Sequence, residues 1–458
     1  MFLFETHIAV VIGVAITLMA AVMVLQQRRT PQSTAAWLMF ILLAPYLAIP
    51  VFLALGFRKR GSGFVPIAFR DAGAEAEVPE EATGRTDLEN LFIGYGMPPA
   101  TGGNALRLCE DGQDCWREVL EIVGSATKTL DVTFYLIADD AVGRAFVEAL
   151  TEKARAGVRV RLIIDRLGGF LRPARQLSAL RAAGGEVRDF SPLVQRPNRG
   201  HLNLRNHRKM ILADGMRVLS GGRNIGAEYL GPDAEGGRWS DLSFVLEGPA
   251  VQGFADVFRS DWATTGGKEA EPTVVGTARA GDSKVQLVPS GPDLKDDPLH
   301  DGLASAIYSA RRRIWIVTPY FLPTEHLEHA LSTAARGGVD VRILVPARSN
   351  QRIADLARGG YLRGLGAVGC TILRYEGGMI HAKACVIDDM ACVGSANFDV
   401  RSMLLNFEMM LFLYGAADVA WVADWFGRFE SRCRTGTVPS RLWRRLVEGV
   451  FRLGAPIL

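Results

Sequence analysis

Two long apolar runs dominate the pattern of hydrophobic and polar positions at the start of the chain. Residues 8–25 and 35–57 contain no charged side chain, and a short polar segment separates them. At a rise of about 1.5 Å per residue, such runs are long enough to cross the roughly 30 Å hydrocarbon core of a bilayer as helices. We therefore predict a two-helix transmembrane hairpin over residues 1–60, with Pro45 and Pro50 kinking its second helix.

The charges that flank these runs suggest how the chain is oriented. Arg58, Lys59 and Arg60 follow the second run, whereas the segment between the runs carries Arg28 and Arg29. Because positive residues concentrate on the cytoplasmic side of a membrane, this excess favours a cytoplasmic position for the remainder of the chain. The basic triplet would attract anionic lipid head groups, and a plain stop-transfer signal explains it equally well.

After the apolar runs, helical and strand-like patterns alternate. A linker rich in Gly, Pro, Glu and Ala spans residues 61–100, and helix-strand alternation then covers residues 115–165 and recurs over 303–346. Such alternation is typical of helices that cover a sheet, and one long repeat indicates domain duplication. We predict an α/β fold, a duplicated α/β/α sandwich with pseudo-twofold symmetry, whose repeats span residues 101–270 and 271–458.

Composition adds little to this picture. The net charge is only +3, and the six cysteines form no C-x-x-C pair and no zinc-like spacing with histidine. We therefore expect buried free thiols and no metal site. The tail that begins at Ser440 has apolar residues at helical spacing together with Arg444 and Arg445, so it either lies on a membrane surface or packs on the body.

Each predicted repeat carries one copy of the pattern H-x-K-x4-D. The copies consist of His207, Lys209 and Asp214, and of His381, Lys383 and Asp388. Residues i and i+2 of a strand point to the same face, so each histidine and its lysine should project together. A pseudo-twofold axis would place the two histidines side by side.

Phosphoryl chemistry accounts for these residue types. A neutral imidazole attacks phosphorus, a protonated imidazole donates a proton to the leaving alkoxide, and lysines neutralise the phosphate oxygens. Asn224 and Asn397 end the Gly-rich segments GGRN and GSAN, where they could donate hydrogen bonds to the same oxygens. Ser395 has no hydroxyl counterpart, because Gly222 occupies the equivalent position.

A nucleophilic histidine also needs a carboxylate that fixes its tautomer. Alignment of the two repeats pairs Asp241 with His207 and Glu408 with His381, each within one repeat. Asp214 and Asp388, the last residues of the motifs, are then expected to tie down their own loops.

The motif blocks HRKMILAD, from His207, and HAKACVID, from His381, resemble those of the phospholipase D superfamily. The segments GGRNIGAEYLG, RWSDLSFVLEGPAV, VPSGPD and GSANFDVRSMLLNFE bring the chain closer to the bacterial cardiolipin synthases of that superfamily. The resemblance covers nearly the whole chain, although Ala48 stands where the family often has glycine and the linker finds no match. It implies a phospholipase D-type duplicated sandwich and a multi-pass protein of the bacterial inner membrane.

The resemblance further implies phosphatidyl transfer in two steps. One histidine attacks phosphatidylglycerol, expels glycerol and forms a phosphatidyl-histidine, and a second phosphatidylglycerol supplies the acceptor hydroxyl, giving cardiolipin. No metal or other cofactor is implied. Family precedent favours His207 as the nucleophile and His381 as the acid, and phosphatidylethanolamine could replace one phosphatidylglycerol.

Other interpretations remain open at this point. A phospholipase or a nuclease would use the same groups with water as acceptor, but the apolar hairpin argues against a nuclease and against nucleic acid as a partner. A scaffold without activity would not need two complete motifs. The expected partners are phosphatidylglycerol and anionic membrane lipids, which arginines near the motifs could bind if they are not ordinary surface charges: Arg205, Arg208, Arg223 and Arg401. The oligomeric state stays undetermined.

Overall fold

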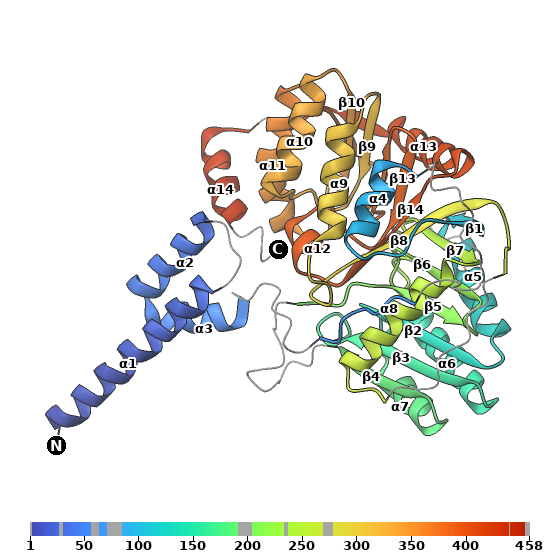
Figure 1. Ribbon diagram of the computed structural model, residues 1–458, viewed down its shortest axis with the longest axis horizontal. Helices are drawn as coiled ribbons and strands as arrows, with labels where there is room; N and C mark the ends of the chain where they lie inside the picture. The colour runs from blue at the N-terminus through green and yellow to red at the C-terminus, as the bar shows by residue number, and fades with distance from the viewer. Residues whose placement is uncertain are drawn as a thin grey trace.

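The computed structural model describes residues 2–26, 31–55, 64–70, 85–190, 204–232, 237–268, 278–438 and 440–453. A body built on one large sheet follows a group of N-terminal helices (Figure 1). Of the charges used above to predict orientation, Arg28, Arg29, Arg58, Lys59 and Arg60 lie outside the described residues.

The N-terminal region contains three helices among its described residues: α1 (Phe2–Leu25), α2 (Pro31–Leu43) and α3 (Pro45–Leu55). The prediction of one continuous second helix was therefore wrong. Pro45 has no backbone N–H and its ring crowds the preceding turn, so the helix ends before it and a new one begins. Ala20, Val24 and Ile41 pack with Ala48 and Phe52 where the three helices meet. In the described part of the chain, no helix combines the length and the apolar character needed to cross a membrane.

The body is organised around a fifteen-stranded sheet. Its strands from the first half of the chain are β1 (Thr101–Cys109), β2 (Thr129–Phe134), β3 (Arg159–Asp165), β4 (Glu186–Phe190), β5 (Met210–Ala213), β6 (Arg217–Gly221) and β7 (Ser243–Glu247). Those from the second half are β8 (Ser283–Ser290), β9 (Arg313–Val317), β10 (Asp340–Pro346), β11 (Thr371–Tyr375), β12 (Ala384–Ile387), β13 (Met390–Gly394), β14 (Glu408–Leu413) and β15 (Cys433–Thr435).

The strand order repeats about the centre of this sheet. It runs β15-β11-β10-β9-β12-β13-β14-β8 and then β1-β7-β6-β5-β2-β3-β4. Each half therefore has the same order read outward from the antiparallel β1–β8 pair, apart from the added edge strand β15. This is the order that two similar units produce when they join edge to edge about a twofold axis, and it supports the predicted duplication.

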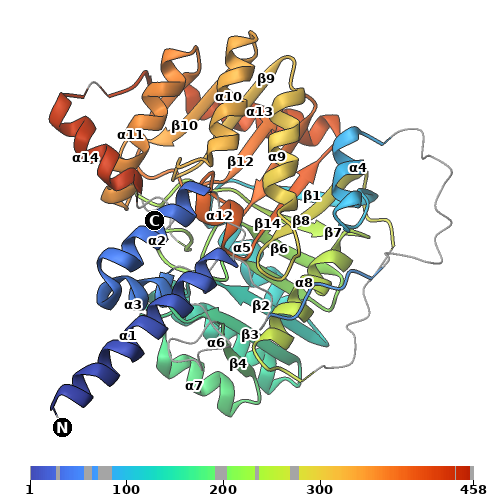
Figure 2. The ribbon, with the colours of Figure 1, turned by 60° about the vertical axis from the view of Figure 1, so that its left-hand side comes forward.

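Helices cover both faces of the sheet (Figures 1 and 2). Along β14, Met409 and Leu411 pack into the cluster that includes α8 (Val251–Thr264) and α13 (Ala416–Glu430), whereas Met410 and Phe412 face the opposite cluster. This alternation is what a strand buried on both faces requires. The opposite face is covered by α5 (Gly112–Ser125), α6 (Ala141–Arg155), α7 (Ala174–Ala182), α9 (Pro298–Ser309), α10 (Glu325–Arg336) and α11 (Arg352–Ala367).

Parts of the predicted linker belong to the body. Arg70 N donates to Asp256 Oδ2 at 2.8 Å, and Ile67 is buried in the core. Residues 87–94 form α4 (Asp87–Gly94), with Thr86 as its N-cap, and residues 71–84 lie outside the described residues. The remaining helices are α12 (Val400–Leu404), beside the site, and α14 (Leu442–Leu453), near the end of the chain.

Candidate active site

The two histidine segments lie against segments from the opposite half of the chain. His207 N donates to Phe407 O at 2.9 Å, and Phe407 N donates to Arg205 O at 2.9 Å. In the same way, His381 N donates to Ser240 O at 2.6 Å. These hydrogen bonds form isolated parallel β-bridges. One joins the residues just before β5 to those just before β14, and the other joins the residues just before β12 to those just before β7.

This backbone pairing determines which carboxylate reaches which histidine. His207 Nδ1 lies 3.1 Å from Glu408 Oε2, and His381 Nδ1 lies 2.7 Å from Asp241 Oδ2. The sequence-based pairing within each repeat was therefore wrong, because the twofold arrangement exchanges the carboxylates between halves. A carboxylate on Nδ1 leaves Nε2 with the free lone pair, as the predicted chemistry requires.

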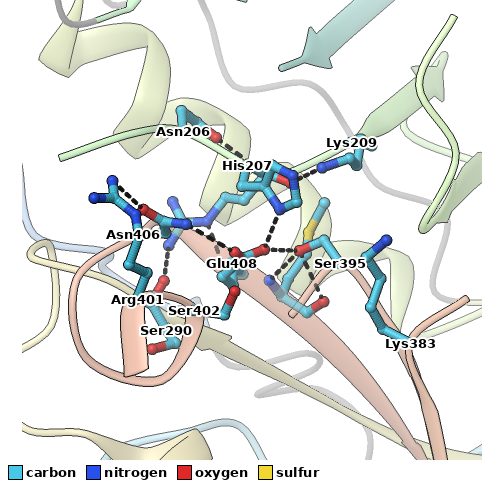
Figure 3. Close-up of polar contacts among 12 residues, drawn as sticks. Asn206, His207, Lys209, Ser290, Lys383, Ser395, Arg401, Ser402, Asn406 and Glu408 are labelled. Carbon is cyan, nitrogen blue, oxygen red and sulfur yellow. Dashed lines mark hydrogen bonds and ion pairs between the residues drawn. The ribbon is translucent and has the colours of Figure 1, made fainter. Parts of the chain in front are cut away.

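Glu408 accepts from two side chains besides His207, whereas Asp241 accepts from the backbone N–H of Leu242 besides His381. Ser395 Oγ donates to Glu408 Oε2 at 2.6 Å, and Asn406 Nδ2 donates to Oε1 at 3.3 Å (Figure 3). At the position equivalent to Ser395, a Cβ on Gly222 would collide with the carboxylate of Asp241. The missing hydroxyl is thus explained, because Asp241 fills its space. Asn406 was not identified from the sequence.

Both imidazoles are kept neutral by their surroundings. Burial lowers the pKa of His207, and the nearby Lys209 lowers it further while Glu408 opposes the shift. Burial followed by the charge of Lys383 lowers the pKa of His381 to about 3, against the raising effect of Asp241. A neutral ring with an unprotonated Nε2 can act as a nucleophile.

The two lysines lie beside the rings. Lys209 Nζ donates to His207 O at 2.6 Å, and Lys383 Nζ lies 2.7 Å from His381 Nδ1 and 3.0 Å from His381 Nε2. Burial lowers the pKa of Lys383 to about 8 although Asp241 and Glu408 oppose it. Burial, with repulsion from Lys383, also holds the pKa of Lys209 well below its ordinary value. The two halves of the site therefore interact electrostatically.

The carboxylates remain charged in this environment. Burial alone would raise the pKa of Asp241, but Lys383 and His381 outweigh it and hold the pKa well below its usual range. Burial likewise opposes ionisation of Glu408, yet His207 and Lys209 lower its pKa. Two buried carboxylates thus lie among the two lysines and the two imidazoles.

Aromatic rings form part of the wall around the histidines. The Tyr135 ring contacts His207 edge-on, with centroids 5.1 Å apart, and Tyr229 makes an edge-on contact of similar geometry with His381 at 5.2 Å. Trp239 lies 5.5 Å from His381. Sequence reasoning did not assign Tyr229 and Trp239 to the site, although both lie within the quoted segments GGRNIGAEYLG and RWSDLSFVLEGPAV.

The side chains of Asn224 and Asn397 are both buried. Asn224 Nδ2 donates to Tyr229 Oη at 3.2 Å. The Oδ1 atoms of Asn224 and Asn397 are buried, and neither accepts a hydrogen bond from the described residues. Because an amide oxygen accepts hydrogen bonds, a substrate hydroxyl can pair with it and a phosphate oxygen cannot.

Asp214 and Asp388 lie away from the rings and hold turns. Asp214 accepts hydrogen bonds from the backbone N–H groups of residues 127–129, and Asp388 from those of residues 311–313. Both have the left-handed backbone, with φ of 51° and 47°. These contacts agree with the expectation that the motif aspartates tie down their own loops.

The arginines near the motifs divide into two groups. Arg208 is buried between Asp261 and Asp293, and Arg223 donates to the carbonyls of Cys109 and Asp241. Neither is a surface charge or a head-group ligand, so both interpretations were wrong for them. Arg205 is also buried and lies 3.6 Å from Asp165, so it is not a surface charge either. Arg401 donates to Asn406 Oδ1 at 3.3 Å beside Glu408.

Within the residues that the structure describes, no group of three or more His, Cys, Asp or Glu side chains is placed to hold a metal ion. The arrangement instead presents two neutral imidazoles, each backed by a carboxylate and accompanied by a lysine.

Comparison with known proteins places this site in a family. The family described as "Cardiolipin synthase, PLD-like domain" matches residues 119–262 and 303–429, and "Phospholipase_D-nuclease N-terminal" matches residues 15–56. The chain is 32% identical to a cardiolipin synthase of Halalkalibacterium halodurans over 98% of its own length and 93% of the relative's. The chain belongs to the cardiolipin synthase family.

Two further proteins extend the comparison. The major cardiolipin synthase ClsA of Bacillus subtilis is 31% identical over 96% of this chain and 97% of its own. The crystal structure of a phosphatidylserine synthase from Haemophilus influenzae matches with a TM-score of 0.60 at 15% identity, over 81% of this chain and 98% of its own. This second likeness concerns the fold, and it shows that the α/β architecture is the one found in that enzyme.

Proposed function

We propose that the chain makes cardiolipin by transferring a phosphatidyl group between two phosphatidylglycerol molecules through a phosphohistidine. The observation that carries this proposal is the pair of neutral histidines, each oriented by a buried carboxylate from the opposite half of the chain. Membership of the cardiolipin synthase family supplies the lipid substrate. We assign the two catalytic units to residues 101–270 and 271–458, and the N-terminal helices to membrane attachment.

We assign the attacking role to His207. Its carboxylate, Glu408, is held by two further donors, which fixes the ring, and its side chain is 13% exposed against 5% for His381. His207 Nε2 attacks phosphorus, and the bond from phosphorus to the glycerol oxygen breaks. His381, which gains a proton when the phosphodiester anion enters beside it, donates that proton to the departing glycerol.

The second step reverses these roles. The hydroxyl of a second phosphatidylglycerol gives its proton to His381 while its oxygen attacks phosphorus, and the bond between phosphorus and His207 breaks. Lys209, Lys383 and the side-chain amides of Asn224 and Asn397 stabilise the phosphate oxygens in both steps. Water in place of the second lipid would release phosphatidic acid instead.

The first test replaces each histidine in the full chain. We expect His207→Ala and His381→Ala to abolish cardiolipin formation from phosphatidylglycerol vesicles, as measured by mass spectrometry of the lipids. His329→Ala, an exposed histidine on α10, is the matched control and should retain activity.

Quenching in denaturant at mildly alkaline pH, where the phosphorus–nitrogen bond survives, followed by peptide mass spectrometry should locate the phosphatidyl group on His207. A covalent adduct on His381 would reverse the assigned roles. Cardiolipin production by either alanine variant would overturn the mechanism, and phosphatidic acid as the main product would indicate a hydrolase.

A further inference from the structure

Two groups of large apolar side chains are exposed on the body. The first lies in the connection between β3 and α7, where Phe170 and Leu171 are 71% and 74% exposed; we call residues 167–171 the apolar loop. The second is the outer face of α14, where Leu442, Trp443 and Leu446 are 62–75% exposed; we call these three residues the α14 face. Such exposure of apolar groups indicates a surface that is covered by a partner.

The apolar loop is tied directly to the first histidine segment. Asp165 Oδ1 accepts from Leu167 N at 2.9 Å, and its Oδ2 accepts from Asn206 N at 3.0 Å. Asn206 immediately precedes His207. A Cβ on Gly168 would collide with Tyr135, so the loop lies against the tyrosine whose ring contacts His207. The exposed Phe170 and Leu171 therefore belong to an ordered loop beside the site.

Helix α14 is likewise held in place. Glu448 is buried, pairs with Arg363 of α11 and accepts from Arg444 Nε at 3.1 Å. A Cβ on Gly359 would lie 2.7 Å from Glu448 Oε1, so this glycine allows the close approach of the two helices. The sequence left two alternatives for the tail, packing on the body or exposure toward a membrane. One side of α14 packs on the body, and the α14 face points outward.

The inner end of α14 reaches the other side of the site. Phe451 and Tyr320 both pack against a cluster formed by Leu322 and by Ala354 and Ala357 of α11. Tyr320 follows β9 as Tyr135 follows β2, so the two tyrosines occupy equivalent positions in the two halves. The apolar loop and α14 therefore lie beside equivalent elements on the two sides of the active site.

Charge and position indicate what covers this surface. Arg441, Arg444 and Arg445 accompany the α14 face, and the combination of Trp, Leu and Arg on one helix is typical of helices that lie in a membrane interface. Both views show α14 on the same side of the body as α1–α3 (Figures 1 and 2). We infer that the apolar loop and the α14 face dock on the surface of an anionic phospholipid bilayer, one on each side of the active site.

This inference rests on the proposed function, which supplies phosphatidylglycerol as the substrate. It adds how that lipid reaches the active site. Docking on both sides of the histidines would place the site over the lipid head groups, so that a phosphodiester enters without its acyl chains leaving the bilayer. The proposal therefore concerns access to lipid in a bilayer, and it makes no change to the chemistry at the histidines.

The test compares one lipid in two physical forms. The full chain is reconstituted in vesicles that contain phosphatidylglycerol at varied surface fractions, or receives short-chain phosphatidylglycerol as dissolved monomers. Phe170→Glu and Leu446→Glu should each raise the apparent KM for vesicle lipid by about tenfold, because a charge replaces an apolar group that the bilayer buries. Turnover of the monomeric lipid should not change. Met216→Glu, at a 52% exposed apolar position in the β5–β6 turn, is the control.

Hydrogen exchange measured on the same proteins gives a readout independent of activity. Amides of residues 166–172 and 440–453 should exchange more slowly on phosphatidylglycerol vesicles than on phosphatidylcholine vesicles, and Leu446→Glu should remove this difference in α14. Unchanged KM values on vesicles in both variants would overturn the inference, as would protection that rises with protein concentration without lipid, since a second copy of the chain would then cover this face. If wild type makes no cardiolipin from either lipid form, the proposed function fails instead.

Discussion

At the residue scale, each imidazole has a carboxylate at its Nδ1 atom and a lysine close to the same residue. Glu408 and Asp241 lie at the Nδ1 atoms of His207 and His381. Lys209 Nζ donates to the backbone carbonyl of His207, and Lys383 Nζ lies near both ring nitrogens of His381. A histidine buried without such partners would also be neutral, but neither its ring orientation nor its accepting nitrogen would be fixed. The crossed pairing of carboxylate and histidine is therefore the feature on which the assigned roles depend.

The crossed pairing can be tested by side-chain NMR on protein labelled with ¹⁵N-histidine. We expect Glu408→Gln to shift the ring nitrogens of His207 and to leave those of His381 nearly unchanged, and Asp241→Asn to do the reverse. Each variant should lower kcat by roughly 100- to 10,000-fold, because the charge that stabilises an imidazolium is lost. Pairing within each repeat would produce the opposite pattern of shifts.

A pH dependence follows from the low pKa of Lys383, which is about 8 against an ordinary 10.5. Above pH 8 this lysine loses the charge that neutralises phosphate oxygens, so kcat should fall as pH rises. Stability should change in the opposite direction: between pH 8 and 10.5 the unfolded chain binds more protons than the folded one, so rising pH favours folding.

The measurement is a kcat profile from pH 6 to 10 for wild type, Lys383→Arg and a control, Lys128→Arg, at an exposed position. An arginine keeps its charge throughout this range, so the variant should lose the alkaline decline in whatever activity remains. A decline that persists unchanged in Lys383→Arg would assign the titration to another group.

At the scale of elements, short backbone bridges and tight turns position the site. The bridge between Asn206 and Phe407, and that between Ser240 and Ile380, fix the entries of four strands relative to each other. The turns that follow β5 and β12 are fastened by Asp214 and Asp388, whose left-handed backbone suits few residues besides Gly, Asn and Asp. The aspartate of each motif thus fixes the turn after the strand that follows the histidine, and it takes no part in the reaction.

Removing one of these aspartate side chains should lower the stability of the fold more than it lowers the catalytic rate. We expect Asp388→Ala to reduce the free energy of unfolding by about 1–3 kcal/mol, because three backbone N–H groups lose their acceptor and alanine fits the positive φ poorly. Thermal denaturation measures the loss. Asp389→Ala, at the adjacent exposed aspartate, should have little effect. A fully stable but inactive Asp388→Ala protein would contradict this structural role.

At the scale of the whole molecule, the site exists only because the two halves join through β1 and β8. Each half contributes a histidine and a lysine, and each also contributes the carboxylate that the other half needs. Neither half alone contains a complete histidine–carboxylate pair. The pseudo-twofold arrangement of the sheet makes the two halves of the body alike. Helices α14 and α1–α3 lie on one side of that body, so they distinguish this side of the molecule from the other.

Because both histidines come from one chain, mixed inactive variants should not rescue each other. We expect His207→Ala and His381→Ala proteins, co-expressed and purified together, to make no cardiolipin from phosphatidylglycerol vesicles. Each protein expressed alone and a wild-type sample at the same concentration are the controls. Restored activity in the mixture would mean that the site is shared between two copies of the chain.

The sequence alone determined the chemistry and the local structure. The paired motifs identified His207, Lys209, His381 and Lys383, and the alternation of helix and strand patterns predicted the α/β body, because both signals depend on neighbouring residues. The tertiary structure decided what depends on contacts between distant residues: Glu408 reaches His207 and Asp241 reaches His381, Arg208 and Arg223 are buried, and only one side of α14 packs on the body. Alignment of repeats reveals which residues are equivalent, but a twofold axis decides which equivalent residues meet, and no local pattern in the chain encodes the position of that axis.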